Sequence, residues 1–379
     1  AGTAGLNVTL SGSETGVGYT LYSGGLPTTY TASGTGSAID FGPVTAGTYS
    51  VVALNAATLC SRTLSGTAVI SISSLPVTYA VSGGGSYCSG ASGVNISLAG
   101  SQSGVNYALY NGASVVGTSV AGTGSTISFG SHTAAGTYSV LATNATSGCS
   151  APMSGTANVS INSAPAVQTV TGGGSYCAGS AGAIIGLSSS QSGTIYQLYN
   201  GASATGSPIN GTGSAISFGP QTTVGNYSVV AVNSSTGCTR PMSGSVTVSS
   251  NPLPVVQTVA GGGAYCSGGT GSEIMLTSSV AGTSYMLYRG ATAASGALAG
   301  TGGSLSFGPQ TTAGAYTVLA TNTTTGCTRA MSGTAVVSVN AAPAVQSVTG
   351  GGAYCAGGTG SSVGLSGSQL GINYTISNG

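Results

Sequence analysis

The chain has 379 residues, of which 68 are glycine and only 2% are charged, whereas about a quarter of the residues are charged in an ordinary soluble protein. A net charge of +1 with four scattered arginines excludes a nucleic-acid surface that tracks phosphates and a basic patch for an anionic membrane. The chain is 40% apolar with strand-like patterning, which argues against disorder, and no stretch nears the roughly 18 apolar residues of a spanning helix. We therefore expect no nucleic-acid partner and no membrane insertion.

Short segments with alternating apolar residues follow one another through residues 178–266. "AIIGL" places Ala183, Ile185 and Leu187 on one face, and "IYQLY" and "AISF" follow with the same period of two. "GNYSVVAVN" is apolar on both faces, so it is expected to be a central strand covered on both sides. "SVTVSS" and "PVVQTVAGGG" complete six or seven strands separated by Gly, Ser, Asn and Pro. Because no 3.6-residue period occurs, the pattern predicts an all-β fold, an antiparallel sandwich.

The same short sequence motifs recur at a fixed interval of 89 residues. "GGGSYCSG" begins at Gly83, and close copies begin at Gly172, Gly261 and Gly350. This period is too long for a helical solenoid and suits one small β-sandwich per repeat. The sequence therefore predicts a tandem array with repeats at 1–88, 89–177, 178–266 and 267–355, and the start of a fifth at 356–379. Boundaries near Pro76, Pro165, Pro254 and Pro343 are the alternative division.

Eight cysteines form two series with this period, one in "YC" words and one mostly in "GC" words. They are not clustered as metal ligands are, so disulfides formed in an oxidising compartment are expected, with no metal site. A hairpin centred on Pro252 would bring the two flanking cysteines together at its mouth. Pairing of Cys88 with Cys149 and pairing between neighbouring domains remain open. The favoured pairs are Cys60–Cys88, Cys149–Cys177, Cys238–Cys266 and Cys327–Cys355.

One tyrosine begins each "GTYSV"-like strand, and the glycine runs precede each "YC" word. Each such tyrosine is either a tyrosine corner or a filler of the core. The glycine runs lack the Lys and Ser/Thr of a phosphate loop, so they are interpreted as backbone devices that kink a strand or allow close approach. The four tyrosines are Tyr49, Tyr138, Tyr227 and Tyr316.

The repeat contains the segments "YCSGASGVNISLAGSQSGVNYALYNG", "GTYSVLATNATSGC" and "MSGTANVSIN". With these segments, the repeat resembles the Ig-like repeats of very large secreted surface proteins of Bacteroidota. Proteins of that kind are typically exported by the type IX system and carry long tandem arrays. The resemblance spans essentially the whole chain and implies an extracellular, Ig-like, non-enzymatic array. It identifies no ligand.

Residues for catalysis are scarce. His132 is the one histidine, and its counterparts one and two repeats later are Gln221 and Gln310, so the position is interpreted as a tolerant loop. Three carboxylates in different contexts form no repeated acid–base pair and no calcium site. We therefore expect no catalytic residues, no cofactor and no enzymatic activity.

Three arginines, Arg62, Arg240 and Arg329, each lie two residues after a cysteine of the second series. A guanidinium there can bond loop carbonyls or stack on tyrosine at a domain junction, so these residues are candidate junction contacts. The alternative is a solvated surface position.

These observations favour a structural role at the cell surface or outside the cell. The leading hypothesis is the repeat region of a secreted filament or stalk, in which the partners are other copies or repeats of the same chain. The alternative is an adhesin whose repeats bind glycans through the Tyr and Asn of the "LYNG" turn. The sequence is also expected to be a window on a longer array. Because its two ends duplicate the same two strands, simple donor-strand exchange between them is not expected.

Overall fold

The structure is a computed structural model that describes residues 5–378. One compact unit comprises residues up to Ala164 together with Thr236–Cys238, and the second comprises Pro165–Ser235 and the residues from Thr239 onward. All regular elements among the described residues are β-strands, and none of these residues belongs to a helix able to cross a membrane. The strands form four successive sandwiches, named sandwich 1 to sandwich 4, and a C-terminal strand pair.

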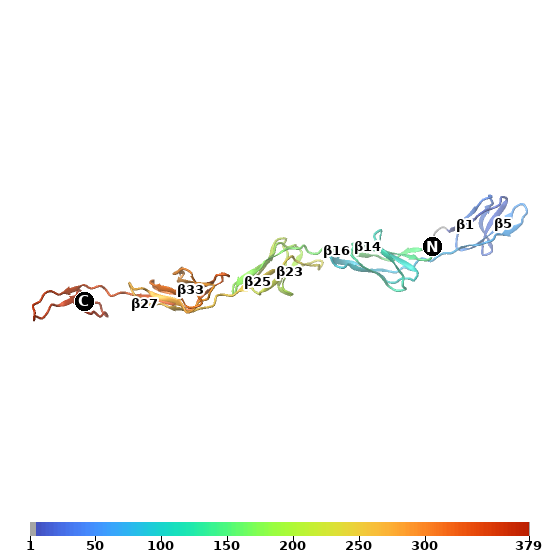
Figure 1. Ribbon diagram of the computed structural model, residues 1–379. Helices are drawn as coiled ribbons and strands as arrows, with labels where there is room; N and C mark the ends of the chain where they lie inside the picture. The colour runs from blue at the N-terminus through green and yellow to red at the C-terminus, as the bar shows by residue number, and fades with distance from the viewer. Residues whose placement is uncertain (1–4, 379) are drawn as a thin grey trace. The chain divides into compact units, whose positions relative to one another are not determined.

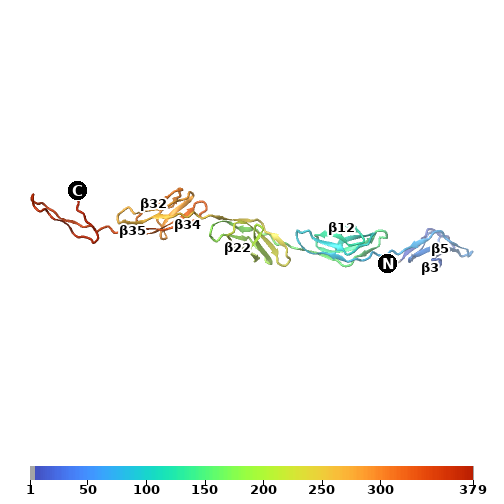
Figure 2. The same ribbon diagram turned by 90° about the horizontal axis from the view of Figure 1, so that it is seen from below.

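Sandwich 2 shows the complete arrangement. Three strands form one sheet in the order β13-β10-β8, and the second sheet runs β12-β11-β14-β16-β9 with β15 beside β14. Strands β14 and β16 of the larger sheet are labelled in Figure 1 and β12 in Figure 2. The strands are β8 (Val81–Gly83), β9 (Gly85–Cys88), β10 (Val94–Leu98), β11 (Val105–Asn111), β12 (Ser114–Ala121), β13 (Ile127–His132), β14 (Gly136–Asn144), β15 (Ser150–Pro152) and β16 (Ala157–Asn162).

Sandwiches 3 and 4 repeat this arrangement within the second unit. Sandwich 3 comprises β17 (Val170–Gly172), β18 (Gly174–Cys177), β19 (Ala183–Leu187), β20 (Thr194–Asn200), β21 (Ser203–Asn210), β22 (Ile216–Gln221), β23 (Gly225–Asn233), β24 (Thr239–Pro241) and β25 (Val246–Asn251). Sandwich 4 comprises β26 (Val259–Gly261), β27 (Gly263–Cys266), β28 (Ser272–Leu276), β29 (Thr283–Arg289), β30 (Thr292–Ala293), β31 (Leu298–Ala299), β32 (Leu305–Gln310), β33 (Gly314–Asn322), β34 (Thr328–Ala330) and β35 (Ala335–Asn340).

Sandwich 1 and the C-terminal strand pair contain fewer strands. In sandwich 1, β1 pairs with β4, and the other sheet runs β3-β2-β5-β6 with β7 on β5. At the other end of the chain, β36 (Val348–Gly350) pairs with β37 (Val363–Leu365). The strands of sandwich 1 are β1 (Leu6–Leu10), β2 (Val17–Ser23), β3 (Leu26–Ser33), β4 (Ile39–Val44), β5 (Gly47–Asn55), β6 (Ser61–Thr63) and β7 (Ala68–Ile70).

The first strand of each complete sandwich divides between the two sheets. β8 pairs antiparallel with β10, and just beyond it β9 pairs in parallel with β16. The glycine run is the crossing point: Gly83 and Gly84 have φ of +95° and +75°, and a Cβ on them would lie 2.2 and 2.7 Å from the carbonyl oxygens of Asn95 and Asn158. Only glycine permits this backbone conformation and this approach without strain, so the interpretation of the run as a backbone device is confirmed.

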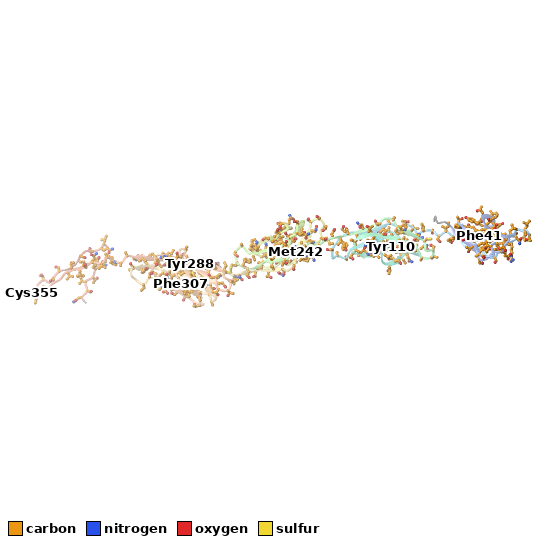
Figure 3. The ribbon with its side chains drawn as sticks, turned by 90° about the horizontal axis from the view of Figure 1, so that it is seen from above. Phe41, Tyr110, Met242, Tyr288, Phe307 and Cys355 are labelled. Carbon is orange, nitrogen blue, oxygen red and sulfur yellow. A yellow bond between two sulfur atoms is a disulfide. The ribbon has the colours of Figure 1, made fainter. Side chains whose placement is uncertain are left out.

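The core of each sandwich is built from the inward faces of both sheets. In sandwich 3, Ile185, Tyr196, Leu198 and Tyr227 are at most 1% exposed, as strand alternation predicts. The two-faced apolar strand β23 is central in its sheet, but Val230 on its outer face is only half-buried, so the expectation of cover on both sides is wrong. Figure 3 shows the packed side chains, with Met242 of this core labelled.

The tyrosines of the "GTYSV"-like strands form tyrosine corners. Tyr138 is 1% exposed, and its hydroxyl donates to the carbonyl of Ala134, four residues upstream, at 2.9 Å. Tyr49, Tyr227 and Tyr316 donate in the same way to residues four positions upstream. The tyrosine corners and the order of the strands in the two sheets are both features of Ig-like domains, so the chain is a tandem array of Ig-like antiparallel β-sandwiches. Each tyrosine therefore both fills the core and forms the corner.

The strand pairing bears on where one repeat ends. A boundary directly after Cys88 would separate β8 and β9 from β10 and β16, to which they are hydrogen-bonded. A boundary near Pro76 leaves all the strands of sandwich 2 in one segment, and the same holds for Pro165 and Pro254 in the next two sandwiches.

Candidate functional site

The most distinctive feature of the array is a set of cysteines at the ends of the sandwiches. Strand β9 carries Cys88 to the end of the larger sheet, where Cys88 stands opposite Asn162 in the parallel register with β16. Hydrogen bonds fix this strand laterally. Ser86 and Ser160 bond through their hydroxyls at 2.6 Å, and the Tyr87 hydroxyl donates to the carbonyl of Thr133.

The second cysteine series lies in tight turns. In sandwich 4 the Asn322 carboxamide oxygen accepts from the amides of Thr324 and Thr325 at 3.0 Å, and Gly326 adopts φ +72° immediately before Cys327. This Asx-type turn reverses the chain between β33 and β34 and presents the cysteine at its end. The sequence "N-x-[ST]-[ST]-G-C" therefore forms a hydrogen-bonded turn that ends in the cysteine, and we call it the cysteine turn.

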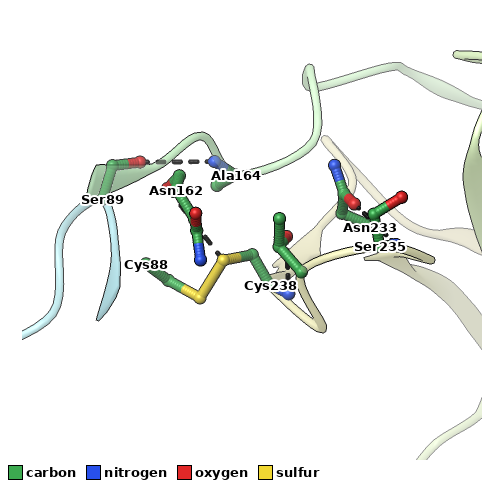
Figure 4. The surroundings of a disulfide bond; sticks show 8 residues. Cys88, Ser89, Asn162, Ala164, Asn233, Ser235 and Cys238 are labelled. Carbon is green, nitrogen blue, oxygen red and sulfur yellow. Dashed lines mark hydrogen bonds between the residues drawn. A yellow bond between two sulfur atoms is a disulfide. The ribbon is translucent and has the colours of Figure 1, made fainter. Parts of the chain in front are cut away.

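Two disulfides join these two kinds of position. Cys88 pairs with Cys238, and Cys177 pairs with Cys327, with Cα–Cα distances of 5.5 and 5.6 Å and a sequence separation of 150 residues in both. Figure 4 shows the first pair, with the Cys238 sulfur 4.0 Å from the Asn162 carbonyl oxygen and the Ala164 amide donating to the Ser89 hydroxyl at 3.4 Å. We name these two bonds the staples. Each runs from the β9-type strand of one sandwich to the cysteine turn that follows the central strand of the next.

The pairing predicted from the sequence is wrong for these four cysteines. The segment between Cys60 and Cys88 is not a hairpin closed at its mouth, because β8 and β9 pair with strands that lie later in the chain. The Cys88–Cys149 alternative is also excluded, since Cys88 is bonded to Cys238. The structure has the third arrangement, in which the bond joins neighbouring domains.

Four cysteines are unpaired among the described residues: Cys60, Cys149, Cys266 and Cys355. The Cys149 sulfur lies 4.0 Å from the carbonyl oxygen of Ser73, 76 residues earlier, which repeats the contact of Cys238 with Asn162 in distance and separation. The cysteine turn of sandwich 2 is therefore seated against sandwich 1 as it is at a formed staple.

The candidate arginines occupy two environments. Arg240 and Arg329 each point a guanidinium nitrogen at the carbonyl of the proline that opens their own linker, Pro165 and Pro254, both at 3.5 Å. Arg62 instead lines an open cleft with Glu14 and Cys60. The guanidinium is thus bonded to the linker in sandwiches 3 and 4 and lines a cleft in sandwich 1, and all three arginines are exposed.

The histidine position is structural. His132 ends strand β13, and its Nε2 lies 3.2 Å from the carbonyl of Phe129, so Nε2 carries the donated proton. Gln221 and Gln310 donate to the matching Phe218 and Phe307 carbonyls at 3.1 Å. The position is therefore the end of a strand and not a loop, but the prediction that it tolerates different residues is confirmed, because Val44, which has no side-chain donor, occupies it in sandwich 1.

Comparisons with known proteins add the following. No protein-family model matches the chain, and no curated protein matches it. Among solved structures, immunoglobulin domains 1–4 of Sidekick-1 align with 13% identity and a TM-score of 0.21, over 89% of this chain and 95% of that one. The full ectodomain of mouse nectin-like molecule 4 aligns with 14% identity and a TM-score of 0.27, over 72% of this chain and 97% of that one. The assignment as Ig-like rests on the strand order and tyrosine corners.

Proposed function

We propose that this chain is a structural repeat region of a secreted filament or cell-surface stalk, and that it has no enzymatic activity. The observation that supports this most strongly is the pair of staples, which overlap in sequence because Cys177 lies between Cys88 and Cys238. Successive sandwiches are thereby joined by a disulfide in addition to the peptide linker. Such cross-links persist in an oxidising, extracellular compartment.

Composition supports the same role. A surface with almost no charge does not keep separate molecules apart in solution, and it favours packing and association. The resemblance to repeats of surface proteins that Bacteroidota export by the type IX system is consistent with export. We therefore propose an extracellular location and a bacterial source of that kind together with the structural role.

The adhesin alternative is less well supported by the "LYNG" turn. The Asn111 and Asn200 carboxamides donate to the carbonyls of Ala135 and Val224 at 3.3 Å, so both side chains already brace their own sandwich. The matching residue in sandwich 4 is Arg289, which differs in charge and size. A glycan-binding turn repeated along an array would be expected to keep the same chemical groups free.

Immunogold electron microscopy with antibodies to the purified chain tests this proposal on cells that produce it. We expect label at regular intervals along extracellular filaments or stalks, and none with antibodies depleted on the chain. Label confined to the cell interior would contradict the proposal. A glycan array tests the alternative. If the chain binds a glycan and the double variant Asn111→Ala, Asn200→Ala does not, that result would favour the adhesin instead.

A further inference from the structure

A small polar cleft lies on sandwich 4, where the hairpin of β29 and β30 meets the end of β32 and the start of β33. Its volume is about 130 Å³. Every residue that lines it belongs to sandwich 4, so the cleft is formed within one domain. Its lining includes Arg289, Thr292, Ala294, Gln310, Thr312 and Tyr316.

The first difference from the other sandwiches at this place is the arginine. Arg289 ends β29, at the position that Asn111 and Asn200 occupy in sandwiches 2 and 3. Those two carboxamides donate to carbonyls of their own sandwich at 3.3 Å. The Asn111 carboxamide lies directly over Gly136, where an added Cβ would be 2.0 Å from its oxygen. The asparagines therefore close this place, whereas Arg289 cannot do so in the same way.

The second difference provides room. Ala294 donates its amide to the Leu287 carbonyl at 2.8 Å, which is the place that Val116 has beside Leu109 in sandwich 2. Val116 packs against the core of its sandwich, and the residue at this position in sandwich 3 is Thr205. Because alanine has only a methyl group, sandwich 4 keeps open a space that a larger side chain occupies elsewhere.

The charge of Arg289 has no partner in the part of the chain that the structure describes. The side chain is half-buried, and its guanidinium forms neither a hydrogen bond nor an ion pair there. Its aliphatic stem lies on Gly314, where an added Cβ would be 2.8 Å from the Arg289 Cδ. Glu273, the one carboxylate in the sequence of sandwich 4, instead accepts from the Ser306 hydroxyl at 2.7 Å. A guanidinium has five donors and no acceptor, so it suits an anion from outside the chain.

The rest of the cleft offers uncharged hydrogen-bonding groups. Among the described residues, the hydroxyls of Thr292 and Thr312 have no hydrogen-bond partner. Gln310 donates its amide to the Phe307 carbonyl at 3.1 Å, and no described residue donates to its side-chain oxygen. These groups can donate to and accept from the hydroxyls of a ligand.

The charge and the lining of the cleft together indicate the class of ligand. One guanidinium balances the single negative charge of a carboxylate and can bond both of its oxygens. A phosphate dianion would keep an excess negative charge, because no second cation lines the cleft. A carboxylate alone would leave the two threonine hydroxyls unused, whereas an acidic sugar carries hydroxyls beside its carboxylate.

We propose that this cleft binds the carboxylate of an acidic sugar, with Arg289 as the anion-binding residue and Thr292 and Thr312 as partners of the sugar hydroxyls. The other three sandwiches have Ser23, Asn111 and Asn200 in place of the arginine, so they lack the charge. A structural array of this kind would carry one ligand site in its four described sandwiches. This inference goes beyond the proposed structural role and does not depend on it.

The test is a ligand-observed NMR titration of the purified 379-residue chain with sodium glucuronate. We expect saturable binding with a Kd of about 1 mM, since a single charged group supplies most of the affinity. Glucose, which lacks the carboxylate, and acetate, which lacks the sugar hydroxyls, should each bind at least about tenfold more weakly.

Two variants introduce the residues of sandwich 2, which the same fold already accommodates. Arg289→Asn removes the charge and Ala294→Val fills the cleft, so each should weaken glucuronate binding at least about tenfold, while the urea midpoint of each variant stays unchanged. Arg329→Asn is the matched control, because it removes an arginine of the same sandwich that bonds the Pro254 carbonyl outside the cleft. It should change glucuronate binding less than about twofold.

Several results would overturn the inference. They are an absence of saturable glucuronate binding, binding of acetate or sulfate as tight as that of glucuronate, and equal effects of Arg289→Asn and Arg329→Asn. The proposed structural role fails separately, because immunogold label along filaments is expected whether or not the cleft binds a sugar.

Discussion

The overlapping staples limit how far the unfolded chain can be extended. With both disulfides intact, the shortest covalent path from Cys88 to Cys327 crosses the first bond, follows the backbone between Cys238 and Cys177, and crosses the second bond. At about 3.5 Å per residue, this path of about 60 residues spans about 210 Å, whereas the direct backbone of about 240 residues spans about 840 Å. The staples therefore hold about 620 Å of contour length in reserve.

Single and double disruptions of the staples should therefore be strongly non-additive. Cys88→Ser alone leaves a path along the backbone to Cys177 and across the second bond, which is longer by about 28 residues, so it releases about 100 Å. Cys177→Ser alone should release about the same length by symmetry. The double variant should release the full length of about 620 Å, because no bypass remains.

Single-molecule force spectroscopy, with handles ligated to the two termini, measures these contour lengths. The background carries serine at Cys60, Cys149, Cys266 and Cys355 so that only the staples vary. A double variant that releases only about twice the length of one single variant, about 200 Å, would mean independent loops and would refute the interlocked arrangement. No change on adding a reductant would refute the staples altogether.

Further consequences concern single residues and the whole array. Leu59 has φ +58°, a left-handed conformation in which its counterparts are glycines, and it is 77% exposed. Leu59→Gly should therefore raise the free energy of unfolding of sandwich 1 by about 1 kcal/mol, measured by urea unfolding. Gly148→Leu should lower the free energy of unfolding of sandwich 2 by a similar amount. Tyr138→Phe should destabilise sandwich 2 by about 1–2 kcal/mol, since it removes the bond to the Ala134 carbonyl, and an unchanged denaturation midpoint would contradict the corner's role. Gly84→Ala should cost about 2 kcal/mol or more in the same assay, because its Cβ would lie 2.7 Å from the Asn158 carbonyl oxygen, whereas Gly12→Ala meets no neighbour. The array should resist trypsin and molar sodium chloride, having four arginines, no lysine and few charges to screen, and rapid fragmentation on a gel would argue against tight packing.

Much of this protein is determined locally and could be read from the sequence. Alternation along a single strand, as at Ala183, Ile185 and Leu187, reports which face of that strand is buried, because side chains alternate across a sheet. The constant spacing of the repeats and the tyrosine of each "GTYSV"-like strand likewise indicated a sandwich array, since both are local signatures of a repeated domain.

The partner of each cysteine was decided only by the tertiary structure. A "YC" cysteine such as Cys88 has turn cysteines on both sides of it in the chain, Cys60 before it and Cys149 and Cys238 among those after it, and a perfect repeat contains nothing local that distinguishes these candidates. The choice depends on β9 crossing to pair in parallel with β16, where Ser86 meets Ser160, and on the next sandwich presenting its turn at that end. Contacts between residues so far apart in the chain follow from how the strands close into a sandwich, and strand periodicity carries no information about them.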